Sequence, residues 1–359
     1  MAYRRLVVKV GSSSLTDASG RISLPQLWAI GRGLQLLQEK LGCSIVIVSS
    51  GAGASGRERL GIRLPLTLPE RQAAAAVGQA LLMLDWARAL APAPVAQMLL
   101  TAADIRDRER YVNARNAIEA SLKLGAVPII NENDSVSTGE IRLGNNDTLS
   151  AWTAYLTGAD ALVILTDVDG FYTADPRRDA RAVRLDVVDD IDEVEGLAAD
   201  TGDRRGTGGM RTKLAAARIA TEAGIETLVI GGGGAGLEAL ALGEVRGTRF
   251  MAMAQAPARK AWLRQLEPAG GIDVDEGAVS ALRRGSSLLA SGITQVAGEF
   301  SFGDPVVISF EGRPVARGLT NYASGALDRI RGRRSSEIAD LLGSKDFDEV
   351  VHRDNLVLV

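Results

Sequence analysis

The stretch Gly206 to Lys213 (GTGGMRTK) has the residue types of a phosphate-binding loop. Its glycines allow backbone N–H groups to close around an anion, and the helix-like run at 214–223 would add the partial positive charge of a helix N-terminus. Lys213 offers a full charge to a transferring phosphoryl group. The order is not that of a Walker A loop, because Thr212 precedes Lys213. The stretch predicts the nucleotide site of a kinase outside the P-loop group, and a glycine-rich surface loop stays open as the alternative.

A second lysine, Lys9, interrupts the apolar stretch 6–10 (LVVKV). Burial of an ammonium group is costly unless an anion pairs with it, so Lys9 either meets an anion or extends along the strand to reach water. Phosphoryl transfer requires mainly positioning and charge neutralisation, and two lysines without a catalytic base are chemically sufficient. Lys9 and Lys213 are therefore predicted to face one phosphoryl group.

Polar residues follow four of the predicted strands, at the point where each strand ends. They are Gly11 with Ser12, Ser49 to Gly51, Asn131 to Asp134, and Thr166 with Asp167. Any one of them could equally cap a helix or form a turn, because Ser, Asn and Asp are common at such positions. Ligands of open α/β sheets bind at the carboxyl ends of the strands, so the four together predict one shared site.

Amides and carboxylates are dense in the runs 131–134 (NEND) and 144–147 (GNND). Amide N–H groups suit the carboxylate of an amino acid, and an Asp side chain suits its ammonium group. Asn146 and Asp147 are also placed to cap the helix predicted after them. We expect both roles, with Asp147 at a helix start and holding Lys9 or Lys213.

The elements that position these residues alternate along the first 250 residues, which is typical of a three-layer α/β/α sandwich on a mainly parallel sheet. Only 4% of residues are aromatic, which suits Ala-rich helices packed on aliphatic strands. Strands are predicted at 6–10, 45–48, 95–99, 127–130, 161–165 and 227–230, with a small hairpin at 136–143. Helices are predicted at 25–41, 70–90, 111–124, 147–157 and 214–223.

The pattern changes near residue 250, which predicts a catalytic domain at 1–250. Residues 251–268 are typical of a linker, and the short strands and glycine-marked turns of 269–359 indicate a small β-barrel domain. Four arginines of that domain could contact RNA: Arg329, Arg331, Arg333 and Arg334. The net charge of −3 and the scarcity of aromatics favour a solvated surface instead, so RNA is not an expected partner.

Several other kinds of protein and site are disfavoured by what the sequence lacks. Cys43 is the only cysteine and His352 the only histidine, which argues against a disulfide, a His-pair metal site and a Ser-His triad. The chain has no signal-peptide pattern and no apolar run near the ~20 residues of a membrane span, so we expect a cytoplasmic protein with no membrane partner. Gly231, Gly233 and Gly236 match G-x-G-x-x-G, but no acidic residue follows at the required distance, so NAD is not predicted.

In combination, these motifs resemble the amino acid kinase family. The resemblance is carried by VVKVGSSSL, VSSGAGASG, INENDSV, GNNDTLSA, LTDVDGFYTADPR and GTGGMRTK, and it spans nearly the whole chain because VDEGA and RGSSLL resemble a C-terminal PUA domain. INEND together with GTGGM-TK is similar to the members that phosphorylate L-glutamate. The resemblance implies transfer of the ATP γ-phosphoryl group to the side-chain carboxylate of L-glutamate, the first step of proline biosynthesis. It also implies Mg²⁺, feedback inhibition by L-proline and a homo-oligomer, either dimer or tetramer.

The same resemblance implies roles for individual residues. Lys9 and Lys213 would flank the transferring phosphoryl group, and Asp147 would organise them. L-Glutamate would be bound by Ser50, Asp134 and Asn146. The ATP site would be lined by Lys9, Gly11, Ser12, Gly51, Thr166, Asp167, Thr207, Gly208, Gly209, Met210, Arg211, Thr212 and Lys213.

Alternatives remain at this point. Within the same fold, the acceptor could be N-acetylglutamate or aspartate, although the kinases for these lack a similar C-terminal domain. From other classes, the chain could be an RNA-binding PUA protein or a scaffold without activity. Two residues depart from the pattern of many relatives: Asn145 stands where Asp is frequent, and Gly53 where an apolar residue is common.

Overall fold

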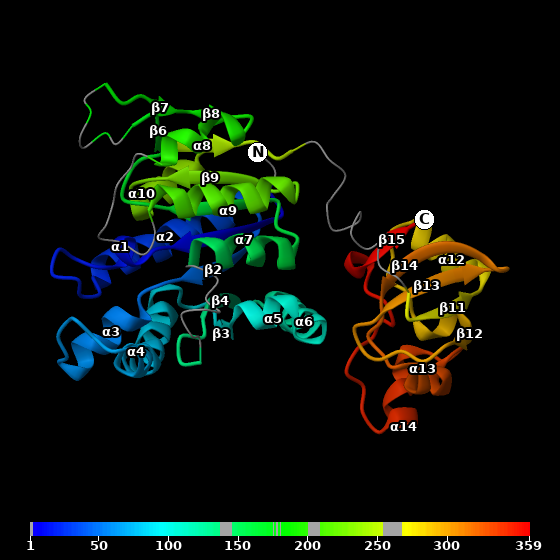
Figure 1. The fold of residues 1–359 in the computed structure, drawn as a ribbon. Helices are drawn as coiled ribbons and strands as arrows, with labels where there is room; N and C mark the ends of the chain where they lie inside the picture. Colours follow the sequence, from blue (N-terminus) through cyan, green and yellow to red (C-terminus); the bar gives the residue numbers. More distant parts are fainter. Residues whose placement is uncertain are drawn as a thin grey trace. The chain divides into compact units, whose positions relative to one another are not determined.

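The computed structural model describes residues 3–136, 146–174, 176, 179, 181–199, 209–253 and 268–359. The chain divides into two compact units, Met1–Ala254 and Gln255–Val359 (Figure 1). Most of the predicted linker at 251–268 lies outside the described residues, so its boundaries stay a prediction. The two units are described separately below.

The first unit is built on an eight-stranded sheet in the order β3-β4-β2-β1-β5-β9-β10-β8. Its parallel strands are β1 (Arg5–Val10), β2 (Ser44–Ser49), β3 (Val95–Leu100), β4 (Val127–Glu132), β5 (Ala161–Leu165) and β9 (Glu226–Ile230). At the other edge, β10 (Gly247–Phe250) runs antiparallel to β9 and pairs with β8 (Val187–Val188). All six predicted strands are confirmed, and because they are parallel their carboxyl ends lie at one edge of the sheet.

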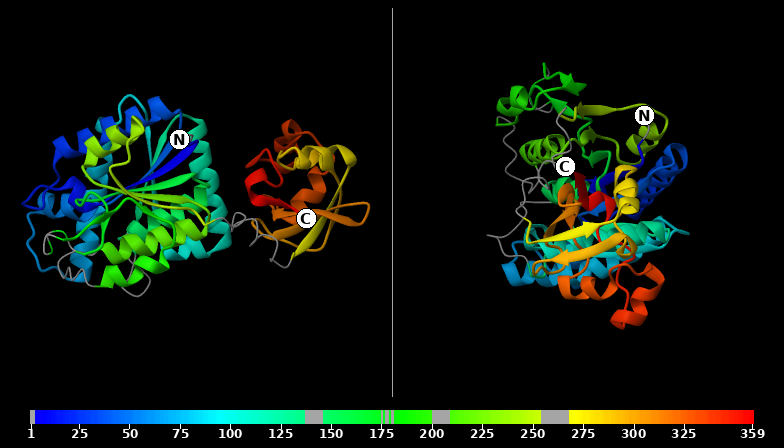
Figure 2. Two further views of the ribbon diagram at one scale, coloured as in Figure 1. Left: turned by 90° about the horizontal axis from the view of Figure 1, so that it is seen from above. Right: turned by 90° about the vertical axis from the view of Figure 1, so that its right-hand side faces the viewer.

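Helices cover both faces of this sheet (Figure 2). One face packs against α2 (Leu24–Leu41), α4 (Leu68–Ala89) and α10 (Gly233–Ala241), and the other against α6 (Arg108–Lys123), α7 (Asn146–Thr157) and α9 (Met210–Glu222). In β1, Leu6, Val8 and Val10 belong to the apolar core on the α2 side. Side chains alternate along a strand, so Lys9 points to the opposite face, where α7 packs against β1.

Several elements were missed or misplaced by the sequence analysis. The structure adds the helices α1 (Ser12–Leu15), α3 (Ala52–Leu60), α5 (Ala102–Arg106), α8 (Asp192–Ala199) and α10. It also adds the edge strands β8 and β10 and the short strands β6 (Phe171–Tyr172) and β7 (Arg184–Leu185). Strand β4 continues through Asn131 and Glu132, so these two residues belong to the strand and do not follow it. Apart from Val136, the predicted hairpin at 136–143 lies outside the described residues.

Two glycines in the region that matched G-x-G-x-x-G have a packing role: Gly236, which is part of the match, and Gly234, which is not. A Cβ on Gly234 would lie 2.4 Å from the carbonyl oxygen of Ala29 in α2, and one on Gly236 would lie 2.0 Å from the carbonyl oxygen of Gly231. Only glycine therefore allows α10 to approach α2 and the end of β9 this closely. In the pattern itself, a Cβ on Gly231 would lie 2.7 Å from Asp169 Cα, and Gly233 has a φ of 54°. Close packing and backbone conformation therefore account for the glycine pattern without a dinucleotide.

Helices α3 and α4 also touch backbone to backbone. A Cβ on Gly56 would lie 1.7 Å from the carbonyl oxygen of Ala74, and one on Gly78 would lie 1.8 Å from that of Ala52. Contacts this short can be relieved only if the two helices move apart. The glycines therefore position α3, whose N-terminus follows Ser50.

We expect Gly56→Ala to lower the free energy of unfolding by about 2 to 3 kcal/mol or more, because the added methyl group collides with backbone. The matched control is Gly53→Ala in the same helix, where an added Cβ has nothing within 4 Å. This control should be neutral or stabilising by about 0.5 kcal/mol, since alanine favours the helix over glycine. Chemical denaturation measures both changes, and equal effects would contradict the backbone contact.

The second unit has its own sheet and core. Its strands, in the order β12-β11-β13-β14-β15, are β11 (Gly270–Val274), β12 (Ile293–Ala297), β13 (Pro305–Phe310), β14 (Arg313–Leu319) and β15 (Leu356–Leu358). Helices α12 (Glu276–Arg283), α13 (Ser324–Ile330) and α14 (Ile338–Leu342) accompany it. A separate apolar cluster that includes Ile272, Ile308 and Leu327 fills its interior. In the described part of the chain, no helix is both long and apolar enough to cross a membrane.

Candidate active site

A buried ion pair joins the first strand to α7. Lys9 Nζ lies 2.5 Å from Asp147 Oδ1, and the two residues are 7% and 0% exposed. Thr212 Oγ1 donates a hydrogen bond to Asp147 Oδ2 at 2.7 Å. Asp147 therefore connects the carboxyl end of β1 with the first turn of α9, and its predicted contact with Lys9 is present.

Helix α9 begins earlier than the sequence analysis predicted. It starts at Met210, so Met210, Arg211, Thr212 and Lys213 lie in its first turn and not in a loop before it. Gly209 is the N-cap in an extended conformation, and Met, Arg and Lys are good helix formers, which explains the earlier start. Lys213 is buried at this positively polarised helix end. Thr207 and Gly208 lie outside the described residues.

Two glycines shape the backbone beside Lys9. A Cβ on Gly11 would lie 3.0 Å from Lys9 Nζ, so glycine leaves room for the ammonium group directly after β1. Gly51 is the N-cap of α3 and has a φ of 112°, a backbone conformation that favours glycine. Ser12 is exposed in the short α1 next to Gly11. These backbone positions border the predicted phosphate site at the edge of the sheet.

An amide network lies next to the ion pair. Asn146 precedes Asp147, and its Nδ2 group donates to Ser50 Oγ at 2.8 Å and to Asn131 Oδ1 at 2.9 Å. Asn146 Oδ1 is buried and has no hydrogen-bond partner among the described residues. The structure thus brings Ser50 and Asn146 into direct contact. The Asn146 Oδ1 atom is left as a hydrogen-bond acceptor for a ligand.

The sequence analysis missed two residues that hold this network in place. Asn131 Nδ2 donates to Gln79 Oε1 at 2.9 Å, and Trp86 Nε1 donates to Ser49 Oγ at 2.9 Å. Gln79 and Trp86 are buried on one side of α4, seven residues apart. The signal available in the sequence was a polar residue and an indole at helical spacing within an otherwise Ala-rich helix.

On the other side of β1, the end of β5 carries the residues predicted to contact ATP. Thr166 is buried and its backbone N–H donates to the Ile230 carbonyl at 3.0 Å, while Asp167 is exposed. Asp169, which the sequence analysis did not single out, accepts a hydrogen bond from the Tyr172 hydroxyl at 2.6 Å and pairs with Arg184. These contacts, the Tyr172 hydrogen bond above all, lower the pKa of Asp169, so this edge of the site keeps a negative charge.

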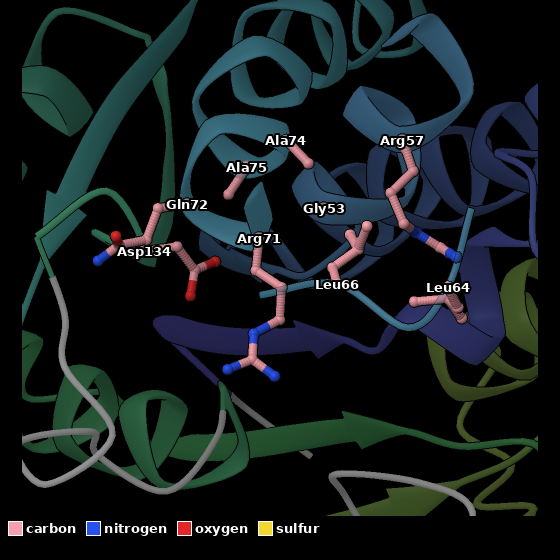
Figure 3. A pocket seen from close by; sticks show the side chains of 9 residues that line it. All are labelled: Gly53, Arg57, Leu64, Leu66, Arg71, Gln72, Ala74, Ala75 and Asp134. Carbon is pink, nitrogen blue, oxygen red and sulfur yellow. The ribbon is translucent and has the colours of Figure 1, made fainter. Parts of the chain in front are cut away.

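Asp134 lines a pocket between α3, α4 and the end of β4 (Figure 3). The pocket is lined by Gly53, Arg57, Leu64, Leu66, Arg71, Gln72, Ala74, Ala75 and Asp134. Gly53 lies in the first turn of α3, directly after Ser50 and Gly51. The pocket therefore adjoins the Ser50 end of the amide network. Asn145, one of the two departures, lies outside the described residues.

The parallel sandwich of the first unit agrees with comparison to known proteins. Residues 4–231 match the amino acid kinase family and residues 270–342 match the PUA domain. The fold is similar to that of carbamate kinase from Giardia lamblia bound to AMP-PNP, with a TM-score of 0.50 and 15% identity over 69% of this chain and 98% of that one. The chain therefore belongs to the amino acid kinase family and carries a C-terminal PUA domain.

Within that family, full-length relatives are glutamate 5-kinases. The chain is 46% identical to the enzyme of Moorella thermoacetica, over 99% of this chain and 96% of the relative. It is 47% identical to that of Thermus thermophilus, over 100% and 98%, and 46% identical to that of Shigella flexneri, over 98% of each. Both the fold class and the family predicted from the sequence are confirmed.

Proposed function

We propose that the chain transfers the γ-phosphoryl group of ATP to the side-chain carboxylate of L-glutamate, forming L-glutamyl 5-phosphate and ADP. The observation that carries the proposal is the buried Lys9–Asp147 pair, directly beside the Ser50–Asn146 contact. A buried cation and a cluster of amide and hydroxyl groups therefore lie together at the carboxyl ends of the strands. The similarity to glutamate 5-kinases over almost the full chain supports the same acceptor.

The reaction needs charge stabilisation more than proton transfer. A carboxylate is already ionised at neutral pH, so its oxygen can attack the γ-phosphorus without a general base. Negative charge spreads over the phosphoryl oxygens as the bond to ADP breaks. Lys9 and Lys213, together with the N-terminus of α9, would stabilise that charge. Asp147 would hold Lys9 directly and the first turn of α9 through Thr212.

Mg²⁺ would enter with the nucleotide. The described residues contain no cluster of three acidic, His or Cys side chains suited to a metal, and Asp147 already contacts Lys9 and Thr212. A Mg²⁺ ion is commonly held by substrate phosphates and one or two carboxylates, with water filling the remaining positions, so these residues fit an ion carried by ATP. When bound, it would neutralise phosphate charge. Gly11, Ser12, Thr166, Asp167 and the start of α9 would border the ATP.

Several further expectations come from the family resemblance or from the composition of the chain. L-Proline as an inhibitor, a homo-oligomer and a cytoplasmic location remain predictions, and so does the absence of RNA binding. The role of the PUA domain is equally open to test, by deletion of the residues beyond Pro268.

The proposed reaction is tested by the formation of an acyl phosphate. Purified protein is given ATP, Mg²⁺ and hydroxylamine, which traps an acyl phosphate as a hydroxamate, with L-glutamate, N-acetyl-L-glutamate, L-aspartate or no acceptor. We expect hydroxamate only with L-glutamate, and its suppression by L-proline. Activity with a different acceptor would overturn the substrate, and inactivity with all three would overturn the kinase function.

A further inference from the structure

We propose that Arg71 binds the α-carboxylate of the acceptor, opposite Asp134, which binds its α-ammonium group. This inference rests on the proposed function and names the part of the site that recognises the amino-acid end of the substrate. Arg71 belongs to the pocket that adjoins Ser50 (Figure 3). The sequence motifs did not point to it.

The first argument is the placement of Arg71 on its helix. It is the fourth residue of α4, after the capping box formed by Thr67 and Glu70. A positive charge near a helix N-terminus is disfavoured by the helix dipole. Arg71 makes no ion pair with any described residue that would offset this cost. A ligand anion in the pocket would offset it.

The second argument is the pairing of charges across the pocket. Arg71 and Asp134 line the same pocket without forming an ion pair with each other. The other lining residues include Leu64, Leu66 and two alanines, and also Arg57 and Gln72. Arg71 is exposed and Asp134 is half-buried, so both charged groups can be reached by a ligand from solvent. Opposite charges held apart in one pocket suit a ligand with a positive and a negative group on neighbouring atoms.

The third argument is that the two charged residues lie close enough together to bind the two charged groups on one carbon atom. The α-ammonium and α-carboxylate of an amino acid share one carbon, so their two partners must be neighbours. In Figure 3, Arg71 stands next to Asp134, whereas Arg57 lies on the far side of the pocket beside Leu64. The amino-acid end would thus lie between Asp134 and Arg71, and the side-chain carboxylate would extend past Gly53 toward Ser50 and Lys9.

The test compares Arg71→Ala with wild-type full-length protein on two acceptors, L-glutamate and 4-aminobutyrate, which lacks the α-carboxylate. Loss of a charged hydrogen bond to a group remote from the reaction should raise KM for L-glutamate about 10- to 100-fold with little change in kcat. The kcat/KM for 4-aminobutyrate should be unchanged, because that molecule has no group for Arg71 to bind. Arg71→Lys should raise the KM for L-glutamate less than Arg71→Ala does, since lysine keeps the charge but not the bidentate geometry.

Two controls make the result specific. Arg59→Ala removes the same charge from an exposed position of α3 that does not line the pocket, and it should leave both acceptors unaffected. Asp134→Asn should instead give similar kcat/KM values for L-glutamate and glutarate, because glutarate lacks only the ammonium group. It should keep the higher kcat/KM for L-glutamate over 4-aminobutyrate. Both analogues are also measured as competitive inhibitors, so a poor acceptor still yields an affinity.

The outcomes separate this inference from the proposed function. An unchanged KM for L-glutamate in Arg71→Ala, or equal losses for L-glutamate and 4-aminobutyrate, would overturn the role of Arg71 while the kinase reaction stands. A wild-type protein that forms no hydroxamate with L-glutamate would overturn the proposed function itself.

Discussion

Lys213→Ala is expected to lower kcat by about 10²- to 10³-fold or more, and Lys9→Ala by a similar factor. Both lysines are buried at the edge of the sheet where the phosphoryl group would transfer, and each alanine variant removes one of the two full positive charges that would neutralise that group. Their interaction with phosphoryl oxygens strengthens as the bond to ADP breaks, so kcat should fall more than the affinity for L-glutamate. The hydroxamate assay gives kcat for each variant.

The control is Lys123→Ala, which removes an exposed lysine at the end of α6 and should leave kcat unchanged. Lys9→Ala also deprives buried Asp147 of its counter-ion, so its activity must be corrected for any unfolded fraction. For that reason Lys213→Ala is the cleaner test. A kcat close to wild type in Lys213→Ala would rule out the proposed role of this lysine.

Much of the catalytic unit could be predicted because its signals are local. The six parallel strands are short aliphatic runs, and the apolar residues around Lys9 in β1 single it out as the charge inside a buried strand. Parallel strands bring their carboxyl ends together, which is why Gly11, Ser50 and Thr166 could be assigned to one edge without a structure.

What could not be predicted depends on contacts between distant segments. Helix α3 contains glycines that disfavour a helix locally, and it forms because Gly56 and Gly78 allow close packing on α4. Gln79 has no local feature that links it to Asn131, 52 residues away. Arg71 looks like an ordinary surface residue until the pocket with Asp134 is known.

The second large effect is expected for Asp147→Asn. This change keeps the side-chain shape but removes the negative charge 2.5 Å from buried Lys9. Breaking a buried pair on one side leaves an uncompensated charge, so the free energy of unfolding without nucleotide should fall by about 3 to 5 kcal/mol. The kcat should also fall by about 10²-fold or more, because Lys9 and the first turn of α9 lose their common anchor. Chemical denaturation and the hydroxamate assay measure the two effects.

The matched control is Asp348→Asn, which breaks a pair with Lys345 of similar length, 2.7 Å, on an exposed surface. It should cost about 0 to 1 kcal/mol and leave kcat unchanged, because water compensates both charges. A double variant, Lys9→Met with Asp147→Asn, removes both buried charges and should recover part of the stability. It should recover none of the activity, since the ammonium that faces the phosphoryl group is absent. If the double variant were as unstable as Asp147→Asn alone, the cost would come from lost packing or hydrogen bonds and not from the buried charge of Lys9.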